Sequence, residues 1–284
     1  MEWISRLNSA INYIEEHIQD ELDMEKVGSI AGCTSYHFQR MFAYMSNVPL
    51  SEYIRRRRMS LAAVDLLSGE KVIDVAVKYG YESPTAFNRA FKNIHGVAPS
   101  KISEEGVSVK SFPPIHFHIT IKGECEMNYR IVKKEAFRIV GVSIPLEKEI
   151  EKNNEIVPMF WGRAAMDGTI PRLAEMMNTE TKGLLGVSTC NNAEDWKYYI
   201  AVASTFDATE GLDEYEVPAG TWAIFSGEGK QESMQDLERR IVIDWLPTSG
   251  YEYANAPDIE VYLNSDPDNA MYEVWIPVVK KEAE

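Results

Sequence analysis

Apolar residues recur at helical spacing through the first hundred residues of the chain. The first such set lies three or four residues apart and consists of Ile4, Leu7, Ile11, Ile14 and Ile18. This spacing predicts an amphipathic helix that buries one face. Further helices are predicted over residues 24–32, 36–45, 50–67, 72–80 and 83–96. Asp23, Thr34 or Ser35, and Ser83 stand where side chains cap helix N-termini, and Pro84 falls at the first helical position, where proline is tolerated.

The hydrophobic pattern changes after residue 105. Pro113 and Pro114 interrupt residues 106–126, which we interpret as a linker or an extended strand. From Met127 onward, strand patterns alternate with helices in two similar halves, each of strand, helix, strand and strand. The sequence therefore predicts an all-α domain over 1–105 with two helix-turn-helix units, and an α+β domain over 127–284.

Charge and cysteine content narrow the class of protein. The chain of 284 residues has a formal net charge of −15. Residues 1–105 hold 12 Lys+Arg and 14 Asp+Glu, whereas the remainder holds 17 and 30, so the second part carries nearly all of the acidic excess. Three scattered cysteines form no CxxC pair. With no long apolar run and no signal-like N-terminus, we expect a cytoplasmic protein without membrane contact.

A short motif occurs twice in the first domain. "FQRMF" at 38–42 and "FNRAF" at 87–91 both read Phe-polar-Arg-apolar-Phe, and each follows a short helix and a glycine-containing turn. The paired Phe residues share a helix face and suit a core, while Arg40 and Arg89 point elsewhere. An exposed Arg beside Gln or Asn near a helix N-terminus can read base edges in a major groove. The alternative is a helical bundle with aromatic core residues.

The first domain resembles the DNA-binding domain of the AraC/XylS family of transcription regulators. "VAVKYGYESPTAFNRAFKNIHGVAPSKI", residues 75–102, is similar to that family's signature. The resemblance implies two DNA-reading helices, whose expected contact residues are Tyr36, His37, Gln39 and Arg40 in the first and Thr85, Asn88 and Arg89 in the second. We expect double-stranded promoter DNA as a partner, together with RNA polymerase.

Four consecutive arginines, Arg55 to Arg58, lie in the long helix between the two motifs. Consecutive helix residues are about 100° apart, so these side chains nearly encircle the helix and cannot form one stripe. We expect one or two of them to contact phosphates and the others to pair with acidic residues or pack on their own domain.

The second domain resembles the GyrI-like effector-binding family. The resemblance is carried by "VPAGTWAIFSGEG", "WLPTSGYE" and "PDIEVYLN", followed by "MYEVWIPV". It implies an acidic residue on the strand near 260, deep among aromatic rings. Glu260 and Tyr262 share a strand face, and a carboxylate among aromatic faces suits a lipophilic cation. The candidate ligand-binding residues are Glu260, Tyr262, Trp161, Tyr199, Trp222 and Trp245; a solvated Glu on a polar strand face is the alternative.

These observations favour a transcription regulator that senses a small amphipathic effector. Two alternatives stay open, a small-molecule hydrolase using Glu260 and a nearby Tyr, and a protein that sequesters a toxic compound. His116 and His118 share a strand face but lack a partner at metal-ligand spacing, so we expect no metal and no cofactor. Two helix-turn-helix units in one chain make a dimer unnecessary for DNA binding, and we expect a monomer or a weak dimer.

Overall fold

A computed structural model describes residues 2–118, 126–190, 193–264, 266 and 269–281. The chain divides into two compact units. The first unit contains Met1–Ala31 and Ser46–His118, and the second contains Gly32–Met45 and Ile119–Glu284. A segment from the all-α part of the sequence therefore belongs, by its contacts, to the second unit. Part of the expected linker, 119–125, lies outside the described residues.

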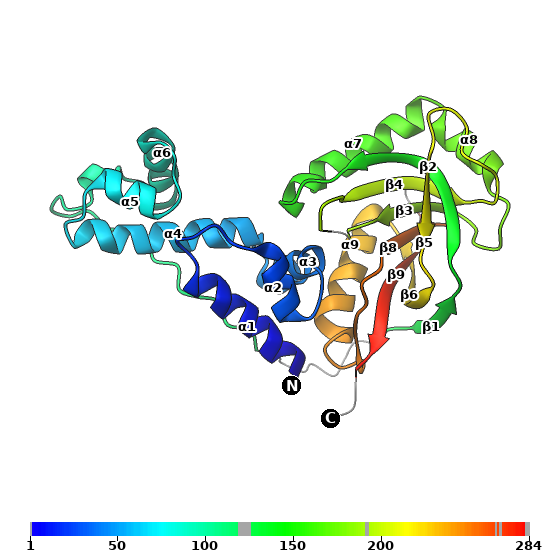
Figure 1. The fold of residues 1–284 in the computed structure, drawn as a ribbon, viewed down its shortest axis with the longest axis horizontal. Helices are drawn as coiled ribbons and strands as arrows, with labels where there is room; N and C mark the ends of the chain where they lie inside the picture. The colour runs from blue at the N-terminus through cyan, green and yellow to red at the C-terminus, as the bar shows by residue number, and fades with distance from the viewer. Residues whose placement is uncertain (1, 119–125, 191–192, 265, 267–268, 282–284) are drawn as a thin grey trace. The chain divides into compact units, whose positions relative to one another are not determined.

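The helices of the first unit follow the hydrophobic spacing of the sequence. They are α1 (Glu2–Glu16), α2 (Met24–Ala31), α4 (Leu50–Leu67), α5 (Val72–Lys78), α6 (Pro84–His95) and the short 3₁₀ helix η1 (Pro99–Lys101). Phe87 and Phe91 of α6 are fully buried in one cluster with Met59 of α4 and Val75 of α5. The two Phe residues of the second repeated motif thus hold α6 against α4 and α5. Figure 1 shows these three helices packed together.

Three side chains cap helices as the sequence predicts. The Lys26 amide donates to Asp23 Oδ1 at 3.0 Å, and the His37 amide donates to Thr34 Oγ1 at 3.2 Å. Ser83 Oγ accepts from the Ala86 amide, and Pro84 occupies the first helical position of α6. Each cap satisfies a donor that the first helical turn leaves without an intrahelical partner.

The four consecutive arginines of α4 all contact groups of their own unit. Arg57 is the most buried of the four: its Nη2 donates to Glu15 Oε2 at 2.6 Å, and its Nη1 donates to the Phe112 carbonyl at 2.6 Å. Arg58 donates to the Ile18 and Asp20 carbonyls. Arg56 and Arg55 both pair with Glu52. Only the Arg55 side chain, 51% exposed, is more than half open to solvent.

The second unit is built on a nine-stranded antiparallel sheet among the described residues. Its strands are β1 (Tyr129–Lys134), β2 (Phe137–Pro145), β3 (Leu184–Ser188), β4 (Lys197–Ala203), β5 (Asp213–Val217), β6 (Gly220–Gly229), β7 (Tyr251–Tyr253), β8 (Asp258–Tyr262) and β9 (Ala270–Lys280). Its helices are α3 (Ser35–Ser46), η2 (Ile150–Lys152), α7 (Asn153–Met166), α8 (Thr169–Met176), α9 (Gln231–Arg240) and the π-helix η3 (Ile241–Trp245).

The sheet confirms the expected pair of similar halves, and one strand of each half pairs with a strand of the other half. The strand order is β1-β6-β9-β8-β3-β4-β2-β5, with β7 on β9. The first strand of each half therefore pairs with the other half, since β1 pairs with β6 and β5 pairs with β2. The halves meet where β3 pairs with β8. Residues of β8 thus lie at the centre of the sheet, flanked by both halves.

Helices α7, α8 and α9 cover one face of the sheet. Phe160 and Ala164 of α7 and Leu173 of α8 pack with alternate residues of β4. Helix α9 packs against β6 and β9. The sequence suggests one helix over 154–177, but the structure has two, because Gly168 adopts φ +84°, a left-handed conformation that ends α7 and starts α8.

The described residues include no helix with the length and apolarity that a bilayer span requires. His116 and His118, the pair weighed as metal ligands, have ring centroids 4.7 Å apart. The His116 Nε2 atom lies 3.4 Å from Asn8 Nδ2.

Replacing Arg57 by Ala should lower the free energy of unfolding by about 3 kcal/mol, because it leaves the partly buried Glu15 carboxylate without its cation. Urea unfolding of the full chain, followed by helical circular dichroism, measures the change. The matched control is Arg55→Ala, which removes an exposed arginine from the same helix and should change stability by less than about 0.5 kcal/mol. Equal effects of the two substitutions would contradict the assignment.

Candidate functional site

Glu260 lies in a cluster of aromatic side chains on the helix-covered face of the sheet. Tyr198 and Tyr262 both donate hydrogen bonds to Glu260 Oε2, at 2.9 and 2.8 Å. Trp161 of α7 donates its indole N–H to the Tyr198 hydroxyl at 3.0 Å, and its ring meets the Tyr262 ring edge-on at 4.9 Å. We call Trp161, Tyr198, Glu260 and Tyr262 the Glu260 cluster. Tyr198 is buried and the other three are partly exposed.

Strand alternation and a glycine position this cluster. Glu260 and Tyr262 point to one face of β8, while Ile259 and Val261 point into the core on the other face. Gly186 of β3 pairs directly with Glu260. A Cβ atom at Gly186 would lie 2.1 Å from the Tyr198 hydroxyl and 2.8 Å from Glu260 Oε2. The absence of a side chain at 186 therefore lets the tyrosine reach the carboxylate.

The environment of Glu260 disfavours its charged form. Burial first, and then the negative charge of Glu238 on α9, raise the pKa of Glu260 from 4.5 to about 7. The hydrogen bonds from Tyr262 and Tyr198 and the charge of Arg40 act in the opposite direction and lower this pKa. The carboxyl group is therefore poised to change its charge near neutral pH, and a cation beside it would favour the ionised form.

The structure brings only some of the expected ligand-binding residues together. Trp161 and Tyr262 belong to the Glu260 cluster. Tyr199 points to the opposite face of β4 from Tyr198 and lies in the core with Trp222, which is fully buried. Trp245 packs edge-on against Phe225 and Tyr129, whose strands lie beyond β9 from Glu260. These three aromatics serve the packing of the unit.

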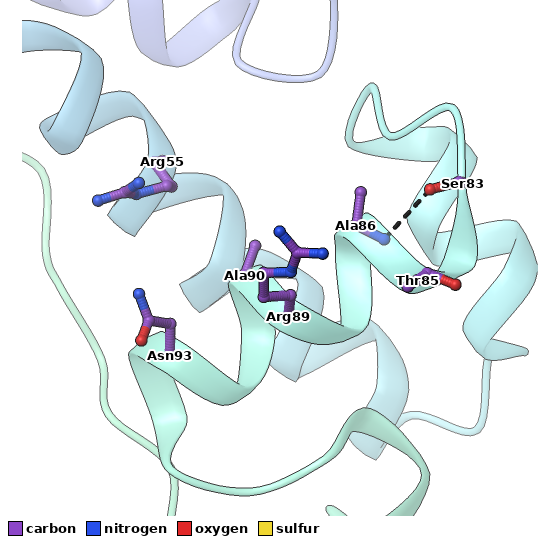
Figure 2. Close-up of a pocket in the computed structure, with 7 residues that line it drawn as sticks. All are labelled: Arg55, Ser83, Thr85, Ala86, Arg89, Ala90 and Asn93. Atoms are coloured by element: carbon purple, nitrogen blue, oxygen red, sulfur yellow. Dashed lines mark hydrogen bonds between the residues drawn. The ribbon is translucent and has the colours of Figure 1, made fainter.

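The expected contact residues of α6 are exposed, and two of them, Thr85 and Arg89, line a hollow in the first unit. Thr85, Asn88 and Arg89 are all open to solvent. The hollow is lined by Arg55, Ser83, Thr85, Ala86, Arg89, Ala90 and Asn93 (Figure 2). Figure 2 shows Arg55 reaching this region from α4, beside Arg89 and Asn93 of α6. Arg55 of α4 and Arg89 of α6 thus both line this hollow.

The expected contact residues of α3 are placed differently. Tyr36, His37 and Gln39 are buried, and the Arg40 side chain is 14% exposed. Within the second unit, Arg40 Nη1 lies 2.7 Å from Asp258 Oδ2 and its Nη2 lies 3.0 Å from Glu238 Oε1. The Tyr36 hydroxyl donates to Ser188 Oγ at 3.2 Å. Tyr36 and Arg40, which correspond to Thr85 and Arg89 of α6, thus contact the strands and α9 of their own unit.

Several residues of these sites were not anticipated from the sequence. Tyr198 takes the place expected for its neighbour Tyr199, and the alternation of β4 fixes which of the two shares the face of Glu260. Asp258 lies two residues before Glu260 on the same strand, so the same alternation places it on the same face. Glu238 shares the buried face of α9 with Met234 and Ile241, but the sequence does not show that it meets Arg40 together with Asp258 of β8.

Comparison with known proteins gives matches over both parts of the chain. The GyrI-like small molecule binding domain matches residues 127–279, and a helix-turn-helix domain matches residues 27–105. The "Right origin-binding protein" of Escherichia coli (strain K12) is 26% identical over 289 residues, which cover 94% of this chain and 95% of that protein. The "Transcriptional regulator Rob" of Salmonella typhimurium is 26% identical over 286 residues, with the same coverage.

A solved structure of a bacterial transcription regulation protein from Staphylococcus aureus MU50 aligns with a TM-score of 0.46. It is 22% identical and covers 55% of this chain and 100% of that one.

Glu260→Gln should stabilise the chain more at pH 8 than at pH 5. The raised pKa means that the folded state holds the Glu260 proton more tightly than the unfolded state, so this residue's contribution to stability falls as pH rises from about 4.5 through about 7. Because glutamine does not ionise, Glu260→Gln avoids this loss of stability. It should raise the free energy of unfolding by about 2 kcal/mol at pH 8. Urea unfolding at both pH values tests this, with the exposed Glu228→Gln as control; a gain that is the same at both pH values would refute it.

Proposed function

We propose that this chain, which belongs to the GyrI-like family of small-molecule binding domains and is an AraC-type DNA-binding transcription regulator, responds to an amphipathic cation at Glu260. The observation that carries the proposal is the partly buried Glu260 carboxylate among the rings of Trp161, Tyr198 and Tyr262. A carboxylate stripped of water attracts a cation strongly, and aromatic faces attract the same cation through their quadrupoles. The apolar groups of an amphipathic ligand would pack on these rings.

The DNA-reading part of the proposal assigns base contacts to α6 and α3. The α6 assignment is supported by the exposure of Thr85, Asn88 and Arg89 near the helix N-terminus and by its fixed seat on the core through Phe87 and Phe91. Arg55 is exposed on the same side and is the member of the arginine run best placed to contact a phosphate. The α3 assignment requires Tyr36, Gln39 and Arg40 to leave their buried positions.

We further propose that the chain acts on promoters together with RNA polymerase, in the cytoplasm, and as a monomer or weak dimer. Two DNA-reading helices in one chain can occupy one site without a second copy. Sedimentation of the DNA complex at micromolar concentration should give one chain per duplex.

Arg89→Ala should weaken binding to a preferred duplex by about 2 kcal/mol, because a guanidinium that reads a base edge contributes on this scale. The duplex is selected by the chain from random sequences, and affinity is measured by fluorescence anisotropy against the selected and a scrambled duplex. The matched control is Lys92→Ala, which removes an exposed charge from the same helix. It should weaken both duplexes alike. An unchanged ratio of the two affinities in Arg89→Ala would contradict base reading by α6.

Tetraphenylphosphonium should bind saturably, and more tightly at pH 8 than at pH 6, because Glu260 ionises with a pKa of about 7. Tryptophan fluorescence follows the titration, since Trp161 belongs to the cluster. Neutral triphenylphosphine oxide and anionic tetraphenylborate should bind more weakly. Glu260→Gln should reduce the cation's affinity by about tenfold or more, which corresponds to about 1.4 kcal/mol or more, and Glu228→Gln should not.

The same titration separates the alternatives. Binding of all three probes alike, or binding that survives Glu260→Gln, would contradict the cation assignment. A panel of aromatic esters incubated with the chain and examined by mass spectrometry tests for hydrolysis; a product heavier by one water would favour an enzyme over a sensor.

A further inference from the structure

Helices α3 and α6 carry matching motifs but present their polar side chains differently. Tyr36, Gln39 and Arg40 of α3 correspond in the repeat to Thr85, Asn88 and Arg89 of α6. The three residues of α6 are exposed, whereas Tyr36 is 8% and Gln39 is 6% exposed. A side chain covered in this way cannot reach a base edge. The groups that contact Tyr36 and Arg40 belong to the rest of the second unit.

Arg40 provides the central contact. Its guanidinium lies between two carboxylates, 2.7 Å from Asp258 Oδ2 and 3.0 Å from Glu238 Oε1. Tyr44, one turn further along α3, donates to Glu238 Oε2 at 2.8 Å and accepts from Arg40 Nη2 at 3.3 Å. The Arg40 guanidinium carbon also lies 5.6 Å from the Tyr36 ring centre and 5.7 Å from that of Tyr44. A cation enclosed by two acids and two rings is held strongly.

The remaining contacts extend this surface along α3. The His37 ring stacks on Tyr253 of β7, with centroids 4.1 Å apart and planes 16° apart, and its Nε2 donates to Asp258 Oδ1 at 3.3 Å. Tyr36 meets Trp196 edge-on at 5.4 Å and hydrogen-bonds Ser188. We call Ser188, Trp196, Glu238, Tyr253 and Asp258 the docking surface. Every one of its members contacts a side chain of α3.

The charges on this surface depend on α3. Burial alone would raise the pKa of Asp258, but His37 and Arg40 outweigh it and hold the pKa below its ordinary value. Without Arg40, the two buried carboxylates would lose the guanidinium that they share, which is costly. Arg40 cannot contact these acids and a DNA base at the same time. Docking of α3 and insertion of α3 into a DNA groove therefore exclude each other.

We propose that the docking surface binds α3 as an intramolecular partner and withholds it from DNA, and that a cation bound at Glu260 releases it. The link to the effector rests on the function proposed above. Glu260 lies two residues from Asp258 on the same face of β8, and Glu238, which pairs with Arg40, also raises the pKa of Glu260 by its charge. A bound cation would neutralise part of the negative potential that holds Arg40. The ligand would then shift the chain toward the DNA-binding arrangement.

The test compares two double variants of the full chain. Glu238→Gln with Asp258→Asn removes both carboxylates that hold Arg40 and leaves every side chain of α3 intact. Glu232→Gln with Asp236→Asn removes the same charge from exposed positions of α9. Affinity for the selected duplex is measured by fluorescence anisotropy, with and without saturating tetraphenylphosphonium. Both single variants, Glu238→Gln and Asp258→Asn, are made in parallel, because each leaves Arg40 one carboxylate and perturbs folding less.

We call Glu238→Gln with Asp258→Asn the docking variant, and Glu232→Gln with Asp236→Asn the exposed control. We expect the docking variant to bind the selected duplex about tenfold more tightly than the wild type and the exposed control, because a larger fraction of its chains has α3 free to bind DNA. The cation should tighten DNA binding by the wild type and leave the docking variant unchanged. Equal DNA affinity in the docking variant and the exposed control would overturn the docking proposal. If the docking variant does not fold, the single variants must show the same direction, and their failure to do so would overturn it equally.

The effector link has its own outcome. Tighter DNA binding by the docking variant, with no effect of a bound cation on the wild type, would overturn release by the effector. Failure of the function itself is distinguishable from either result. In that case no variant would discriminate the selected from the scrambled duplex, or tetraphenylphosphonium would not bind at Glu260.

Discussion

The alternation of β8 is the constraint on which the second unit depends. Ile259 and Val261 must face the core between the halves of the sheet, so Asp258, Glu260 and Tyr262 must all face the helix-covered side. Because β8 lies at the centre of the sheet, these polar groups cannot be at an open edge. Two carboxylates on one buried face require donors and cations, and the partners found for them define the candidate sites.

The two carboxylates are satisfied in different ways. Glu260 accepts hydrogen bonds from two tyrosine hydroxyls. Because these donors are neutral, burial still raises the pKa of Glu260 to about 7. Asp258 accepts hydrogen bonds from Arg40 and His37, and these two side chains lower its pKa. The Glu260 cluster therefore supplies Glu260 with no cation, whereas Arg40 of α3 already supplies Asp258 with one. This difference is the physical reason to assign the external ligand to Glu260 and the internal one to Asp258.

Much of this arrangement could be predicted from the sequence. The helices of the first hundred residues, their caps at Asp23, Thr34 and Ser83, and the paired halves of the sheet follow from local periodicity and turn chemistry. Glu260 and Tyr262 follow from strand alternation together with a family resemblance. Tyr198 was missed because choosing between two adjacent tyrosines requires the register of β4. Glu238 was missed because the spacing of Met234 and Ile241 places it on the buried face of α9 but does not show which side chains of the sheet that face meets.

The repeated motif shows the limit of local pattern. "FQRMF" and "FNRAF" both form helices with buried Phe and an Arg on another face, so the sequence assigns them the same role. Their environments differ because of residues more than 140 positions away in the chain, Ser188, Glu238 and Asp258. An acidic excess in the second part of the sequence, which by itself suggests only repulsion from DNA, thus has a local use. Two of those acids hold the arginine that the first motif would otherwise offer to a base.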